Sequence, residues 1–167
     1  MNSQFLLEKL EDSEEYKKFM QENKEAYLCS AFFIIDFETE NPENKFHFDY
    51  YLPSSKKTFS FEMEDGIKLT ELERFEEKIL EPVSTKTHFD FDEIYDKIEK
   101  EMKDKNISNK IQKMIFSLQH FEGKDLLFGT ILISGMSLIK MTFDISEDKI
   151  GEFEKKSFFD MMKIVKK

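Results

Sequence analysis

The chain has 167 residues, of which 36% are charged and 40% hydrophobic, with five glycines, three prolines and one cysteine. This length fits one domain or two small fused ones, and it is enough to bury a hydrophobic core. The composition excludes collagen-like, low-complexity and disulfide-stabilised classes. We therefore expect a soluble globular protein.

The acidic excess lies entirely in the first half. The net charge is -10, and residues 1–84 hold 20 acids and 10 bases, whereas residues 85–167 hold 15 of each. Such a bias is typical of a solvated face. The alternative is an acidic docking surface for a basic partner, or a mimic of nucleic acid.

Nucleic-acid binding is disfavoured by the basic residues themselves. Arg74 is the single arginine among 25 basic residues. Arginine supplies the planar fork that reads phosphates and base edges, and a negatively charged chain is repelled by a phosphate backbone. We expect no nucleic-acid partner.

The sequence also predicts no membrane segment. The longest apolar run, Leu126–Ile139, is shorter than the roughly 20 residues that a spanning helix needs. Residues 1–25 carry acids throughout and lack the apolar stretch of a signal peptide.

The chain has one cysteine, Cys29, which is expected to be a buried, inert thiol. We therefore expect a cytoplasmic protein.

In the first half the hydrophobic period changes from helical to strand-like. Apolar residues at helical spacing predict a helix over 3–24, broken near Ser13. Alternating apolar and polar residues predict three strands, at 27–38, 46–52 and 58–64. Thr70 and Glu73 form a capping box, so a short helix is predicted over 70–81, with Leu72, Phe75 and Ile79 as its apolar stripe and Pro82 at its end.

The second half repeats this order. Asp90 and Glu93 predict a capped helix that runs to about residue 104. Three strands are predicted at 111–121, 125–134 and 138–145, and an amphipathic helix from about Ser157. The predicted fold is α+β, with two helix-plus-three-strand antiparallel units, 1–82 and 83–167, a linking helix and a C-terminal helix. The six strands could instead form one continuous sheet.

One stretch of the second half resembles a known family. It combines Ile111–Lys124, the turn at Ser134-Gly135-Met136, and the closing strand Ser137–Asp144. Over about half the chain, from Asp90 to Lys167, this pattern is similar to PepSY-like domains, which are related in shape to the cystatin fold. The resemblance implies a helix packed on a curled antiparallel sheet and a binding or regulatory role. It brings no catalytic residues.

Three histidines and one acidic group are the candidates for metal or proton chemistry. The histidines His47, His88 and His120 show no metal-ligand spacing. The acidic group consists of Asp90, Asp92, Glu93 and Asp96, and Tyr95 stands where a calcium loop needs glycine. Helix capping explains Asp90 and Glu93 without a metal ion. We predict no metal site and no cofactor.

Other patterns allow a binding site but no catalytic one. Ser134 lies in a hairpin rather than in a nucleophile elbow, and the glycines are isolated. The period-2 aromatics Phe46, Phe48, Tyr50 and Tyr51 fit a hydrophobic core better than a ligand cavity. The broad apolar surface of the last helix, with Phe158, Phe159, Met161 and Met162, favours burial or self-association.

The sequence thus predicts a non-enzymatic protein-interaction or regulatory module with a protein partner, or one that dimerises. The alternative is a small-molecule binder or enzyme that uses the concave face of the sheet. In that case a cavity lined by His47, Tyr51 or His120 is expected.

Overall fold

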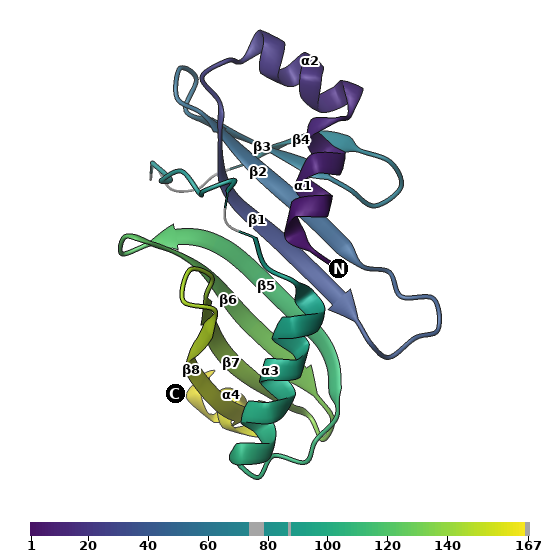
Figure 1. The fold of residues 1–167 in the computed structure, drawn as a ribbon. Helices are drawn as coiled ribbons and strands as arrows, with labels where there is room; N and C mark the ends of the chain where they lie inside the picture. Colours follow the sequence, from purple (N-terminus) through teal and green to yellow (C-terminus); the bar gives the residue numbers. More distant parts are fainter. Residues whose placement is uncertain (74–78, 87, 166–167) are drawn as a thin grey trace.

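A computed structural model describes residues 1–73, 79–86 and 88–165. These residues form a sheet of eight antiparallel strands with helices packed against it (Figure 1). The helices are α1 (Ser3–Glu11), α2 (Glu14–Glu22), α3 (Phe91–Asp104) and α4 (Phe158–Val165). The strands are β1 (Tyr27–Asp36), β2 (Lys45–Leu52), β3 (Lys57–Glu62), β4 (Lys68–Leu72), β5 (Ile111–Phe121), β6 (Lys124–Ile133), β7 (Ser137–Asp144) and β8 (Lys149–Ser157).

The prediction of two helix-plus-three-strand units with a linking helix is wrong. Each half contributes four strands, because β4 and β8 form the two edges of the sheet. Where the linking helix was expected, residues 68–72 pair with β3, with Leu69 opposite Phe61. This pairing overrides the helix signal of Thr70 and Glu73. Phe75, in the stripe of that predicted helix, lies outside the described residues.

The second missed strand, β8, gave no sequence signal because its residues are mostly polar. Its sequence, Lys-Ile-Gly-Glu-Phe-Glu-Lys-Lys-Ser, contains only two large apolar side chains. Charged residues are common on edge strands, where they discourage pairing with other chains. The strand follows β7 through a short turn and pairs with it over most of its length.

The two halves meet in the middle of one sheet. The strand order is β4-β3-β2-β1-β5-β6-β7-β8, so each half is a meander and β1 pairs antiparallel with β5. Phe33 lies opposite Phe116 at this junction, and Ile35 lies opposite Met114. The alternative of one continuous sheet is therefore the arrangement found. The division into units 1–82 and 83–167 stays a prediction.

The helices α1, α2 and α3 cover one face of the sheet, which we call the helix-covered face (Figure 1). The predicted break at Ser13 is confirmed, since its side chain caps α2. Asp90 caps α3 as predicted, by accepting from the amides of Asp92 and Glu93. The stripe of α3 is buried at helical spacing, at Phe91, Ile94, Ile98 and Met102.

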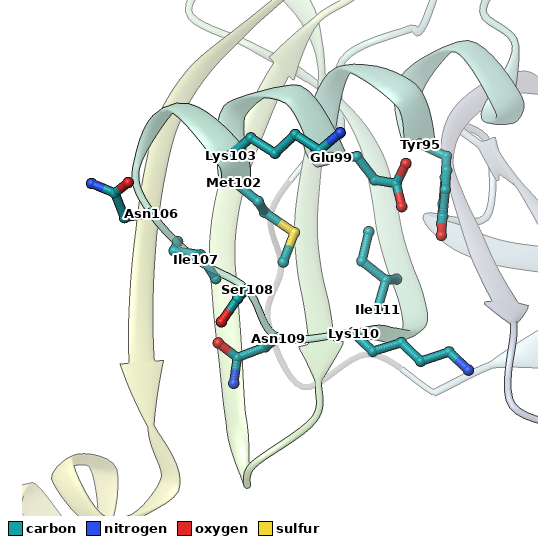
Figure 2. A pocket seen from close by; sticks show the side chains of 10 residues that line it. All are labelled: Tyr95, Glu99, Met102, Lys103, Asn106, Ile107, Ser108, Asn109, Lys110 and Ile111. Carbon is teal, nitrogen blue, oxygen red and sulfur yellow. The ribbon is translucent and has the colours of Figure 1, made fainter.

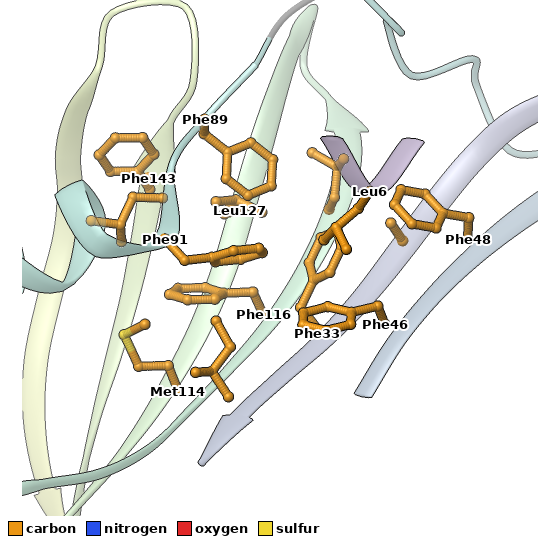
Figure 3. Packing of buried hydrophobic residues seen from close by; sticks show 14 of the residues in the cluster. Leu6, Phe33, Phe46, Phe48, Phe89, Phe91, Met114, Phe116, Leu127 and Phe143 are labelled. Atoms are coloured by element: carbon orange, nitrogen blue, oxygen red, sulfur yellow. The ribbon is translucent and has the colours of Figure 1, made fainter. Parts of the chain in front are cut away.

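Aromatic side chains fill the core between helices and sheet (Figure 3). The Phe91 ring of α3 stacks on Phe116 at 6.2 Å between centroids and meets Phe33 edge-on at 5.1 Å. In the first half, Phe19 of α2 packs on Phe59 and Phe61, both at 5.3 Å. Burying each such side chain contributes roughly 1.5–3 kcal/mol, so this face is the main source of stability.

Candidate functional site

The opposite face of the sheet, which we call the helix-free face because α1, α2 and α3 all lie on the other side, has an apolar centre. On β1 and β5 the side chains that alternate with the core point to this face, among them Phe32, Ile34 and Ile115. Phe128 of β6 continues the row from Phe32 through Ser117. These apolar side chains are half-buried by their sheet neighbours. An antiparallel sheet that faces water on one side normally carries polar residues there, so this centre is unusual.

The apolar centre extends along β6 toward an exposed aromatic ring. Leu126 and Leu132 lie on the same side of β6 as Phe128 and are also half-buried. Phe121, at the end of β5, is 46% exposed, and its ring packs edge-on against Phe128 at 5.9 Å. The centre therefore spans β1 and β5, which form the junction of the halves, and the neighbouring strand β6.

Polar groups surround this centre. On β2 the His47 Nε2 atom lies 2.8 Å from the Glu64 Oε1 atom. Asp49, also on this face, accepts a hydrogen bond from the Ser30 hydroxyl at 2.8 Å. Burial raises the pKa of the Asp49 carboxyl, and hydrogen bonds from Ser60 and Ser30 partly offset this effect. An apolar centre with a polar rim is the usual anatomy of a protein interface.

At the far edge, helix α4 adds exposed apolar side chains. It begins where β8 ends, and the amide of Phe158 donates to the carbonyl of Met136 in the β6–β7 turn at 3.0 Å. Phe159 is 65% exposed and Met162 is 55% exposed. The helix was expected to be buried or to self-associate; two of its four apolar candidates face solvent, while Phe158 and Met161 are half-buried.

His120 joins the segment between the halves to the second half. Its Nδ1 atom lies 2.8 Å from Asp125 and its Nε2 atom lies 3.3 Å from Glu81. Next to it, the Tyr27 hydroxyl donates to the carbonyl of Leu80 at 2.7 Å. A small cavity of about 260 Å³ beside this cluster is lined by Cys29, Ser30 and Gln119, among others. This arrangement fixes the connecting segment against the ends of β1 and β5.

The three predicted candidate histidines are far from forming one site. His47 lies on β2 and pairs with Glu64, His120 lies on β5, and His88 is exposed before α3. Tyr51 packs against Tyr27, with ring centroids at 5.6 Å. Of His47, Tyr51 and His120, it is His120 that lines the cavity of about 260 Å³ beside the connecting segment.

The other candidates serve the fold. Phe46, Phe48 and Tyr50 belong to the core, as the aromatic period suggested. Ser134 accepts from the Lys110 amide at 2.8 Å and so anchors the loop before β5. The buried Cys29 thiol lies 3.3 Å from the carbonyl of Asp49.

The acidic group at the start of α3 contains the helix cap, Asp90. Among residues 1–73, 79–86 and 88–165, no group of three or more His, Cys, Asp or Glu side chains is placed to hold a metal ion. Sequence reasoning missed the residues of the helix-free face. The signal was present, because the strand at 111–121 is apolar on both sides.

Comparisons with known proteins add little to this description. No family model matches the chain, and no curated protein matches it. One solved structure is similar, that of a "putative lipoprotein" from Clostridium difficile 630, with a TM-score of 0.47 and 11% identity, covering 84% of this chain and 89% of that one. No helix in the described part of the chain is both long and apolar enough to span a bilayer.

Proposed function

We propose that this protein is a non-catalytic protein-interaction module that binds its partner with the helix-free face of the sheet. The observation that carries the proposal is the apolar centre of that face, around Phe32, Ile115 and Phe128, which lies on the side of the sheet away from α1, α2 and α3. Contiguous apolar surface rimmed by polar groups is typical of interaction sites.

A broad sheet face suits a protein partner better than a small ligand. Stable protein contacts bury about 800 Å² on each partner, which requires a broad surface and not a pocket. The apolar centre crosses β1, β5 and β6, and its exposed ring, Phe121, lies beside it. The partner is another protein or a second copy of this chain.

Site-specific photo-crosslinking tests this proposal. A benzoylphenylalanine replaces Phe128 in one variant and Phe5 in the control variant, because Phe5 is 61% exposed on the outer side of α1. In cells, we expect a crosslinked product of discrete mass from position 128 and none from position 5. The mass identifies the partner as another protein or as a second copy of the 20.0 kDa chain.

Two results would overturn the proposal. One is the absence of any crosslinked product at position 128. The other is the same set of products from both positions, since this would mean that crosslinking follows exposure and not a specific face.

A further inference from the structure

A groove of about 530 Å³ lies at the end of α3, away from the helix-free face (Figure 2). It is formed by the last turns of α3, the loop over 105–110 and the start of β5. Pockets that hold small ligands have volumes of roughly 300–1,000 Å³, so the groove is large enough for one.

The floor of the groove is apolar. Met102 of α3 is 2% exposed and Ile111 of β5 is 3% exposed. Ile107, in the loop that connects them, is half-buried. In Figure 2 the Met102 side chain points from the helix toward the segment that leads into β5. Of these three side chains, Ile107 keeps the most surface in contact with water, so it is the apolar surface that a ligand would cover.

The rim of the groove carries two available positive charges. Lys103 lies on the helix side and Lys110 on the strand side (Figure 2), and both are exposed. Within the described part of the chain, no ion pair is formed by either ammonium group. The rim also carries one acid, Glu99, and burial together with this acid raises the pKa of the Tyr95 hydroxyl.

The local charge contrasts with that of the whole protein. Residues 97–113 contain six lysines and three acids, whereas the chain carries a net charge of -10. The groove thus lies in a locally positive part of an acidic protein. A negative group on a ligand would be attracted here and repelled elsewhere.

The loop that closes the groove is held in place. The amide of Ile107 donates to the carbonyl of Met102 at 2.8 Å, with Asn106 in the left-handed conformation at φ 57°. The side-chain amide of Asn109 donates to the carbonyl of Ser134 at 2.8 Å. A preformed site loses less conformational entropy on binding than a flexible one.

From these observations we infer that the groove binds a small amphipathic carboxylate, with its apolar part against Ile107, which lies between Met102 and Ile111 in the sequence. Its carboxylate group lies at the rim, where Lys103 on one side and Lys110 on the other supply positive charge. This site is separate from the helix-free face, so it goes beyond the proposed function.

Titration calorimetry with octanoate tests the inference at low ionic strength. The matched ligands are 1-octanol, which is neutral, and octyltrimethylammonium, which is cationic. We expect saturable binding of octanoate, with at least tenfold weaker binding of the other two. The double variant Lys103→Gln, Lys110→Gln should bind octanoate at least tenfold more weakly, whereas the control Lys100→Gln, on α3 outside this groove, should not.

NMR shift mapping with the same probe locates the site, and circular dichroism verifies that each variant is folded. The inference predicts octanoate-dependent shifts at Ile107 and Ile111. Absent saturable binding, equal affinity for the three ligands, unchanged affinity of the double variant, or shifts centred on Phe128 would each overturn it.

Discussion

The two faces of β1 carry similar side chains with different surroundings. Phe33 is fully buried beneath α1 and α3, with the rings of Phe46, Phe48, Phe89 and Phe91 around it. Phe32, the preceding residue, points to the helix-free face and is half-buried. The apolar residues of one face stabilise the fold. Those of the other face, such as Phe32, keep part of their surface in contact with water, because α1, α2 and α3 lie on the opposite side of the sheet.

The largest effect should come from the pair Phe33→Ala and Phe32→Ala. Removing a fully buried ring costs the transfer energy and leaves a cavity, so Phe33→Ala should lower the free energy of unfolding by about 3–5 kcal/mol. Phe32→Ala should lower it by about 1 kcal/mol, since the ring is partly solvated. Urea unfolding of both variants measures the difference. Equal losses would mean that the two faces are equivalent in the fold.

A smaller loss of stability is expected at Gly129, where the side chains of the helix-covered face pack most closely around the backbone. A Cβ atom on Gly129 would lie 2.9 Å from Met141 Cγ and 2.9 Å from Phe116 Cε1, both in the core. Gly129→Ala should therefore destabilise by about 1–3 kcal/mol through overpacking. Thr130→Val, the next residue and on the helix-free face, should change stability by less than about 0.5 kcal/mol. Thermal unfolding can rank the two.

Helix capping gives a third, weaker test of the helix-covered face. Asp90→Ala should lower the unfolding free energy by about 1 kcal/mol, because the amides of Asp92 and Glu93 lose their acceptor. Asp96→Ala, another member of the same acidic group, serves as the control. A larger loss in the control than in Asp90→Ala would argue against the capping role.

A polar group at the rim of the helix-free face should make a small, pH-dependent contribution. Asp144 accepts from the Glu147 amide and from the Ser146 hydroxyl and pairs with Lys124, and these contacts lower its pKa to about 2. Because the folded pKa lies below the ordinary value of 3.8, the stabilisation is present above pH 3.8 and is lost as the pH falls toward 2.

The loss should be about 0.5–1 kcal/mol, because Lys124 is half exposed and solvent screens its pairing with Asp144. Unfolding curves between pH 5 and pH 2.5 should show it in the wild type and not in Asp144→Asn. A variant that loses stability in parallel with the wild type would show that Asp144 does not cause the change.

The sequence predicted the helices and strands whose hydrophobic periodicity and capping residues agree. It missed β4 and β8, the two edge strands of the sheet. The strand at 111–121 and the cap at Asp90 were found because side-chain alternation and capping chemistry act locally. The strand β4 was mistaken for a helix because Thr70 and Glu73 mimic a capping box, and its pairing with β3 depends on contacts made only after folding. The charged β8 has no alternation to detect.

The candidate surfaces were less predictable than the fold. Apolar residues on both sides of 111–121 indicated a central strand, but the sequence does not show which side a helix will cover. The groove at Met102 and Ile111 depends on the path of the loop between them, which no local pattern fixes. The histidines, in contrast, were candidates for metal or proton chemistry because of their residue type alone, and the fold places them on separate elements.

The size of the protein in extracts of cells that express it tests the central claim most directly. Size-exclusion chromatography would compare the wild type, Phe128→Glu on the helix-free face, and Phe5→Glu on the exposed side of α1. We predict that the wild type and Phe5→Glu elute above the 20.0 kDa monomer and that Phe128→Glu elutes as the monomer while keeping its unfolding curve. Elution of all three as the monomer, or of Phe128→Glu with the wild type, would contradict the account.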